Sequence, residues 1–249
     1  MGKRKRLDKL LVDRGLVASR VEGRGRILAG DVLVNEQPST KAGTLIDEHA
    51  AIRIKSNARP YASRGGSKLE TALQRFDIEV SGKIVIDVGA STGGFSDCLL
   101  AHGARQIFAV DVGYGQLDWR LRNDPRVVVF ERTNIRYLEL SALPYPADVA
   151  TIDVSFISLK LVLPRVKALL RPENQIVALI KPQFEVGKGK VGKGGVVRSH
   201  DEHLRVIEEI RAAATALEYG VRGVIESPLL GPAGNKEFFI HLSASHSAP

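Results

Sequence analysis

The feature that most constrains the fold is an alternation of short apolar runs and helix-like segments that begins near residue 67. The apolar runs that resemble strands are KIVIDVG, QIFAVDVG, RVVVFER, DVATIDVSF, QIVALIK, GVRGVIES and EFFIHLS. Helical segments are expected at 67–76, 94–102, 158–170 and 200–219. Strands that are apolar on both faces and alternate with helices are typical of a mainly parallel sheet covered on both sides. The last two strands have a shorter connection and are expected to form an antiparallel edge.

The first 56 residues have a different pattern. The segment RLDKLLVDRGLV suits a short amphipathic helix that ends at Gly15, and Ser19 is a suitable cap for a second helix running toward Gly30. Two short strand-like segments, DVLVNEQ and AIRIKS, follow. The sequence therefore predicts a small α+β domain at 1–56, a linker rich in Ser, Gly, Asn and Pro at 57–67, and a large α/β domain at 68–249.

The charge balance indicates a polyanionic partner. Lysine plus arginine outnumber aspartate plus glutamate by 36 to 28, and the isoelectric point is about 9.7. RNA or DNA is favoured over a membrane surface, although a basic enzyme with no nucleic-acid partner is an alternative. One cysteine excludes an internal disulfide, and the six histidines lack metal-ligand spacing. No apolar run is long enough to span a bilayer, so the cytoplasm is the simplest compartment, and nothing indicates an obligate protein partner.

A glycine-rich turn after the first strand of the large domain indicates a nucleoside cofactor. In VIDVGASTGGFSD the spacing of Gly89 and Gly93 does not fit the dinucleotide fingerprint, but the segment resembles motif I of Rossmann-like methyltransferases. Asp111, at the end of the next strand, suits hydrogen bonds to ribose hydroxyls. S-adenosylmethionine fits better than NAD; a plain tight turn is the alternative. The candidate cofactor-binding residues are Asp87, Gly89, Ala90, Ser91, Thr92, Gly93, Asp111 and Asn134.

Four charged residues are expected to meet at one edge of the sheet. They are Lys68, Asp153, Lys181 and Glu237. Ligands of open α/β sheets bind outside the carboxyl ends of the strands, where Asp153 and Lys181 lie, and Glu237 joins them if its strand is antiparallel. For each residue alone, a surface salt bridge is the favoured explanation. Together, two nearby lysines favour a neutral amine, which suits removal of a proton from a ribose 2′-hydroxyl without a metal.

The order of these four residues resembles the K-D-K-E tetrad of FtsJ-like 2′-O-methyltransferases. More closely, SRGGSKL, DVGASTGGF, DVGYGQL, LRNDPRVVVFERTN, DVSFISL, KPQFEVGKG and GPAGNKEFF resemble the TlyA family, often labelled hemolysin A. The resemblance implies a Rossmann-like S-adenosylmethionine-dependent methyltransferase with a mostly parallel seven-stranded sheet and an antiparallel last strand. It implies an S4-like RNA-binding domain in front, a cytidine 2′-hydroxyl of ribosomal RNA as substrate, and catalytic roles for the tetrad with Lys181 as the base.

The resemblance also suggests RNA contacts. Arg4, Arg6, Arg20, Arg24 and Lys41 are candidate phosphate contacts, and Phe156 is a candidate for stacking on the target base or the cofactor. Solvated cations and a core phenylalanine are the alternatives. Gly23 and Gly25 lie within the expected second helix, and each helical glycine costs about 0.8–1 kcal/mol relative to alanine, so fraying of this helix is expected.

Two other functions are compatible with parts of the pattern. One is a non-catalytic rRNA-binding or ribosome assembly factor, and the other is the membrane-lytic activity that the hemolysin label implies. The cofactor and tetrad signals favour an enzyme over the first. A chain that ends soon after its last strand resembles the shorter members of the family, which favours large-subunit rRNA over small-subunit rRNA.

Overall fold

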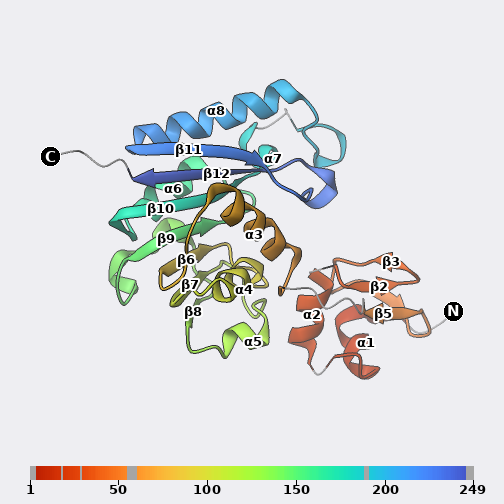
Figure 1. The fold of residues 1–249 in the computed structure, drawn as a ribbon. Coiled ribbons are helices and arrows are strands. Elements are labelled where there is room, and N and C mark those ends of the chain that lie inside the picture. Colours follow the sequence, from red (N-terminus) through yellow and green to blue (C-terminus); the bar gives the residue numbers. More distant parts are fainter. Residues whose placement is uncertain (1–3, 18, 29, 55–60, 188–190, 245–249) are drawn as a thin grey trace.

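A computed structural model of the 249-residue chain describes residues 4–17, 19–28, 30–54, 61–187 and 191–244. A small N-terminal unit lies beside a larger unit built around a central twisted sheet (Figure 1). In the described part of the chain, no helix combines the length and apolar character needed to cross a membrane.

The N-terminal unit consists of two short helices and two small sheets. Its elements are β1 (Arg4–Arg6), α1 (Leu7–Asp13), α2 (Arg20–Leu28), β2 (Val32–Val34), β3 (Gln37–Pro38), β4 (Leu45–Asp47) and β5 (Ile52–Ile54). Strands β1 and β4 pair antiparallel, and β3, β2 and β5 form a three-stranded antiparallel sheet. A small core of Leu7, Leu11, Val17, Ile27 and Val32 holds the helices against the strands.

Helix α2 is continuous from Arg20 to Leu28 despite its glycines, so the expected fraying is absent from this described segment. Gly23 is buried, and a Cβ at this position would lie 3.3 Å from Val17 Cγ2 and 3.4 Å from Leu11 Cδ1. The absence of a side chain therefore lets α2 pack closely on α1, and this contact offsets the conformational cost of a helical glycine.

The large unit contains a seven-stranded sheet in the order β11-β12-β10-β9-β6-β7-β8. The strands are β6 (Ile84–Val88), β7 (Gln106–Val110), β8 (Val127–Phe130), β9 (Ala147–Ile152), β10 (Leu170–Ile180), β11 (Tyr219–Glu226) and β12 (Phe238–Ala244). β12 pairs antiparallel with both β10 and β11, and the β10-β9, β9-β6, β6-β7 and β7-β8 pairs are parallel. The prediction of a mostly parallel sheet with an antiparallel last strand is confirmed. β12 is nevertheless not at the edge, because it is inserted between β10 and β11.

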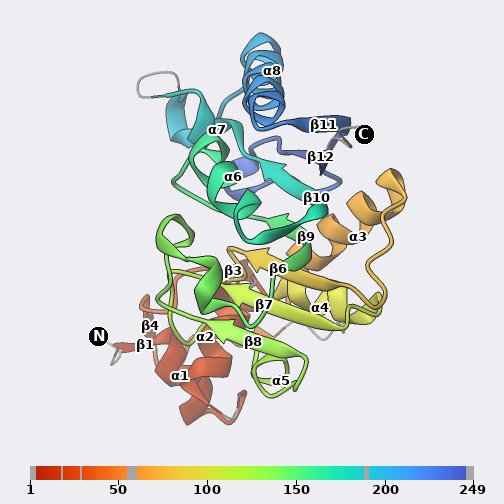
Figure 2. The ribbon, with the colours of Figure 1, turned by 90° about the vertical axis from the view of Figure 1, so that its left-hand side faces the viewer.

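Helices cover both faces of this sheet (Figure 2). They are α3 (Arg64–Phe76), α4 (Gly94–Ala101), α5 (Trp119–Arg122), α6 (Leu159–Lys167), α7 (Pro182–Glu185) and α8 (His200–Ala216), with short 3-10 turns at Ile135–Tyr137, Leu140–Ala142, Lys193–Gly195 and Pro232–Gly234. One core cluster lies between the sheet and α6 and α8, and a second lies between the sheet and α3 and α4. Because the helices cover the two faces of the sheet, the carboxyl ends of the central strands remain available for a site.

Helix α3 begins earlier than its sequence pattern suggests. It starts at Arg64, inside the predicted linker, because the Ser63 hydroxyl accepts a hydrogen bond from the Gly65 amide and caps the helix. Lys68 consequently lies one turn into the helix instead of at its first residue. This position directs the Lys68 side chain toward the edge of the sheet where the strands end.

Candidate active site

The first pair of charged side chains joins helix α3 to the start of β12. Lys68 Nζ donates a hydrogen bond to Glu237 Oε2 over 2.6 Å. The Lys68 side chain is 9% exposed and the Glu237 side chain is fully buried. Removing two charges from water costs free energy that only a close, well-oriented ion pair can offset. The buried Lys68–Glu237 pair is therefore a structural feature of this edge of the sheet and not an incidental surface salt bridge.

The second pair joins the ends of two neighbouring parallel strands. Asp153 follows β9 and Lys181 follows β10, and Lys181 Nζ lies 2.5 Å from Asp153 Oδ1. The same amine donates a hydrogen bond to Ser155 Oγ over 3.0 Å. The side chains of Lys181 and Asp153 are 11% and 24% exposed, so the carboxylate of this pair is more exposed than that of the first pair.

Both pairs line one cleft of about 260 Å³. Its wall also includes the glycine turn at 89–92, the N-terminal end of α3 and Leu28 of α2. The structure thus brings together all four tetrad residues that the sequence singled out, from α3, β9, β10 and β12. Two amines and two carboxylates facing one cavity can hold and deprotonate a weakly acidic hydroxyl.

The glycine turn between β6 and α4 forms the floor of the cleft. Gly89 has φ of +87°, and a Cβ here would collide with the carbonyl oxygen of Asp153 and come within 2.8 Å of its carbonyl carbon. Only glycine allows the turn to lie so close to the end of β9. Ala90, Ser91 and Thr92 follow in the turn and also line the cleft.

Asp111, after β7, braces this turn. Its Oδ2 accepts a hydrogen bond from the Ser91 amide over 2.8 Å, and its Oδ1 accepts one from the Gly113 amide over 2.6 Å. Asp111 also lines a second, much smaller cavity together with Ala90, Ser91, Gln116 and Glu131. The carboxylate therefore shapes the turn and remains beside a cavity at the strand end.

Three of the candidate cofactor-binding residues lie away from the cleft. Asp87 is fully buried, and its carboxylate accepts hydrogen bonds from Ser96 Oγ over 2.6 Å and Thr151 Oγ1 over 3.0 Å. Burial raises the pKa of Asp87 to about 7. Gly93 packs against Leu121, and Asn134 is exposed where it caps the turn at Ile135–Tyr137. Through its two hydrogen bonds the buried Asp87 carboxylate joins the end of β6 to α4 and β9.

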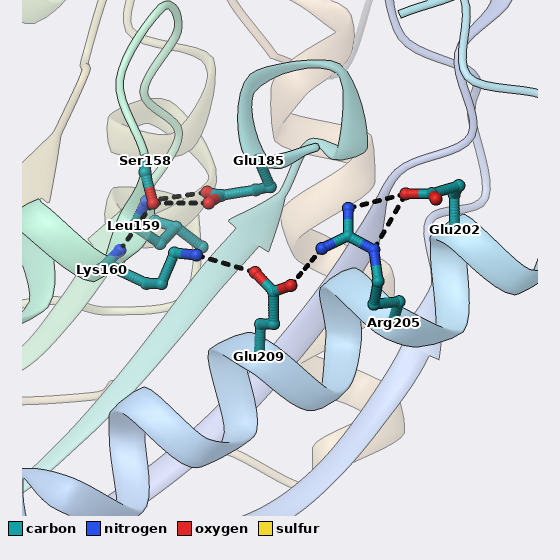
Figure 3. A network of polar contacts seen from close by, with 7 residues as sticks. All are labelled: Ser158, Leu159, Lys160, Glu185, Glu202, Arg205 and Glu209. Atoms are coloured by element: carbon teal, nitrogen blue, oxygen red, sulfur yellow. Dashed lines mark hydrogen bonds and ion pairs between the residues drawn. The ribbon is translucent and has the colours of Figure 1, made fainter. Parts of the chain in front are cut away.

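A further network holds the segment that follows Lys181. Glu185, in α7, accepts hydrogen bonds from Ser158 Oγ over 2.5 Å and from the Leu159 amide over 2.8 Å at the start of α6 (Figure 3). Burial raises the pKa of the Glu185 carboxyl above its ordinary range. Figure 3 also shows Lys160 paired with Glu209 on α8. The lysine at the end of β10 is thereby attached to two helices.

Sequence reasoning did not find Ser155 or Glu185. Ser155 lies two positions after Asp153 in a loop, and a lone serine in a loop carries no distinctive pattern. Glu185 carries a signal that is visible only with the fold in hand, because an acidic side chain opposite the N-terminus of another helix compensates its dipole.

The candidate RNA contacts lie on exposed surfaces. Asp8 is buried and accepts hydrogen bonds from Arg6 and Arg20, and the hydrogen bond from Arg6, followed by that from Arg20, lowers the pKa of Asp8 to about 2. The other candidate cations on the N-terminal unit are exposed: Arg4, Arg24 and Lys41. Phe156 is 90% exposed, so it is not a core residue, and its ring contacts that of Phe184 with centroids 4.9 Å apart.

Comparison with protein families decides the assignment. The model of the FtsJ-like methyltransferase family matches residues 61–244, and that of the S4 domain matches residues 5–52. The chain belongs to the FtsJ-like methyltransferase family. It is 49% identical to the putative rRNA methyltransferase YqxC of Bacillus subtilis, with 96% of this chain and 86% of the relative covered. It is 47% identical to the 16S/23S rRNA (cytidine-2′-O)-methyltransferase TlyA of Mycobacterium tuberculosis, with 97% and 91% covered.

Other relatives of this FtsJ-like methyltransferase carry the hemolysin label. The Hemolysin A of Brachyspira hyodysenteriae is 40% identical over 95% of this chain and 98% of the relative. Among solved structures, a putative hemolysin from Streptococcus thermophilus aligns with a TM-score of 0.76 and 41% identity, covering 99% of this chain and 90% of that one. The resemblance to the TlyA family that the sequence motifs carry is confirmed.

The cofactor of this methyltransferase is S-adenosylmethionine. The residues present fit it, because the glycine turn and the half-buried Asp111 leave backbone and carboxylate groups beside two adjoining cavities. The turn at 89–92 would hold its amino-acid portion and Asp111 its ribose. When bound, S-adenosylmethionine supplies an electrophilic sulfonium methyl group.

Proposed function

We propose that this protein methylates the ribose 2′-hydroxyl of a cytidine in ribosomal RNA. The observation that carries the proposal is the pair of lysine–carboxylate contacts, Lys68–Glu237 and Lys181–Asp153, on one cleft beside the glycine turn. The activities in the names of the relatives from Mycobacterium tuberculosis and Campylobacter jejuni, a 16S/23S and a 23S rRNA (cytidine-2′-O)-methyltransferase, support the same substrate.

In this proposal Lys181 is the general base. Its partner carboxylate, Asp153, is 24% exposed whereas the partner of Lys68 is fully buried, and the Lys181 amine would take the 2′-hydroxyl proton as the oxygen accepts the methyl group. Asp153 holds the amine at the strand end. Lys68, fixed by Glu237, places a second positive charge on the same cleft.

The N-terminal unit is proposed to hold the RNA. Arg6 and Arg20 share one buried carboxylate yet remain about half exposed, with side-chain exposures of 49% and 56%. Guanidinium groups held in this way suit phosphate oxygens. Arg4, Arg24 and Lys41 extend the same basic surface, and Phe156 stacks on the target base. We infer large-subunit rRNA as the main substrate, with small-subunit rRNA as a second possible one.

Methyl transfer from labelled S-adenosylmethionine to purified 30S and 50S subunits that lack the modification tests this function. We expect transfer to 50S subunits, located by nuclease digestion and mass spectrometry on a cytidine ribose. Lys181→Ala should lower the rate about 10²–10⁴-fold, the usual contribution of a general base. Lys83→Ala, at an exposed lysine just before β6, is the control and should keep the wild-type rate.

Three results would contradict the proposal at different points. A fully active Lys181→Ala variant rejects the assignment of the base. Transfer to neither subunit rejects the substrate. Failure of the wild-type protein to bind S-adenosylmethionine in calorimetry rejects catalysis and favours a non-catalytic RNA-binding factor.

A further inference from the structure

Within the described part of the chain, two polar side chains contact the amine of Lys181, and one of them lies outside the tetrad. Asp153 Oδ1 lies 2.5 Å away, and the hydroxyl of Ser155 accepts a hydrogen bond over 3.0 Å. Ser155 follows Asp153 by two positions, in the loop between β9 and α6, and its side chain is exposed. The hydroxyl that contacts Lys181 therefore belongs to the same loop as Asp153 and is exposed to solvent.

The orientation of the amine decides whether it can act as a base. A neutral amine nitrogen carries two hydrogens and one lone pair in tetrahedral directions around its bond to Cε. The carboxylate of Asp153 is in ion-pair contact with the amine, but its Oδ1 makes no hydrogen bond and therefore does not fix the direction of an N–H. A hydrogen-bond acceptor does fix the direction of one N–H, and the lone pair must then occupy one of the two remaining directions.

We propose that Ser155 is a positioning residue that directs the lone pair of Lys181 into the cleft. The inference rests on the proposed function, in which Lys181 is the base. Because Ser155 is exposed, its own hydroxyl hydrogen can point to water, which leaves the oxygen free to accept from the amine. Ser155 thus holds one N–H, and the ion pair with Asp153 holds the amine at the strand end, while the substrate hydroxyl meets the lone pair.

The loop that carries Ser155 is held beside Lys181 by contacts with helix α7. Phe156 adopts φ of +63°, a left-handed conformation that is unfavourable for a bulky residue, and its ring contacts Phe184 of α7. Glu185 of the same helix binds Ser158 at the other end of the loop (Figure 3). The loop at 153–158 and the segment at 181–185 are therefore joined before Ser155 by the Asp153–Lys181 pair and after it by these two contacts.

Four further charged residues line the cleft with Lys181. Asp153 lies at the end of β9, Glu237 at the start of β12, and Lys68 and Arg64 on α3, all lining the same cleft. Ser155 is the uncharged partner, so its removal changes the orientation of the amine without changing the net charge of the site. Because its oxygen accepts from the protonated amine, its loss also disfavours the protonated form slightly, and the acid limb of the pH–rate profile should move to lower pH.

Single-turnover methylation of 50S subunits, measured from pH 6 to 10, tests the inference with a matched pair of variants. Ser155→Thr keeps the hydroxyl, and Ser155→Val has nearly the same shape without it. We expect the plateau rate of Ser155→Val to fall roughly 5–10-fold, as for loss of one hydrogen bond, with its acid limb at lower pH. Ser155→Thr should keep at least half of the wild-type rate. The dissociation constants for RNA and S-adenosylmethionine should change less than twofold.

Ser158→Ala is the control for a purely structural role of the loop. It removes the contact with Glu185 and the cap of α6, so it should lower the melting temperature and leave the acid limb unmoved. Because Thr and Val have nearly equal shape, unequal rates at equal melting temperatures cannot arise from misfolding.

The outcomes separate this inference from the proposed function. Equal rates and acid limbs for Ser155→Thr and Ser155→Val, with an inactive Lys181→Ala, overturn the role of Ser155 and leave Lys181 as the base. A loss confined to RNA affinity also overturns it, since Ser155 would then be an RNA contact. An active Lys181→Ala variant overturns the proposed base itself.

Discussion

Replacing Asp87 by asparagine should change how the stability of the protein depends on pH. The carboxyl group is fully buried, and burial raises its pKa from 3.8 to about 7. Between these values the native state keeps the proton and the unfolded chain has lost it. Unfolding therefore releases a proton, and the free energy of unfolding falls as pH rises from about 4 to about 7. A shift of about 3 units corresponds to about 4 kcal/mol at 1.36 kcal/mol per unit.

The Asp87→Asn variant lacks this titration and keeps polar atoms beside Ser96 and Thr151. Its stability relative to the wild type should therefore increase by up to about 4 kcal/mol between pH 4 and pH 8. Urea unfolding followed by circular dichroism at intervals of one pH unit measures the difference. Asp77→Asn, at an exposed helix end, is the control and should give a curve parallel to the wild type. A parallel curve for Asp87→Asn would refute the reasoning that Asp87 is neutral in the native state below pH 7.

Three further substitutions test the site and the basic surface. Gly231→Ala should lower single-turnover methylation about tenfold with folding preserved, because the new Cβ would overlap Oε1 of the buried Glu237 and displace its carboxylate; wild-type activity would contradict this. Gly89→Ala should cost about 1–3 kcal/mol of stability and at least tenfold in S-adenosylmethionine affinity, measured by calorimetry, because φ is +87° and the Cβ meets Asp153. Arg20→Gln should weaken rRNA binding and reduce the salt slope by about 0.9, as for loss of one phosphate contact; an unchanged slope in filter binding would exclude Arg20 as a contact.

The sequence alone predicts the parts of this molecule that depend on regular strands. Apolar runs ending in Asp153 and Lys181 indicate parallel strands, and parallel neighbours place their carboxyl ends at one edge. The placement of Asp153 and Lys181 at the same edge of the sheet follows from this rule alone. The order of the strands does not follow from it, since no local pattern distinguishes an edge position for β12 from its insertion between β10 and β11.

The orientation of Asp87 illustrates why some site residues could not be placed. β6 is buried on both faces, so the alternation that separates the two faces of a half-exposed strand is absent. The motif suggests a residue of the cofactor site, whereas the carboxylate lies opposite Thr151 on the neighbouring strand β9. Ser155 was hidden for a different reason: its contact spans 26 positions and depends on an irregular loop with a left-handed residue.

The reversed direction of β12 is what completes the site. β12 pairs with β10 so that Phe238 lies opposite Ile180, and the residues flanking this pair are Glu237 and Lys181. The start of β12 therefore lies at the carboxyl end of β10. A parallel strand of the same seven residues would carry Glu237 to the opposite edge of the sheet, about 20 Å away at about 3.3 Å per residue. Lys68 would then lose its buried partner, and an uncompensated buried ammonium costs several kcal/mol. The direction of one strand thus links the stability of this edge to the assembly of both lysine–carboxylate pairs.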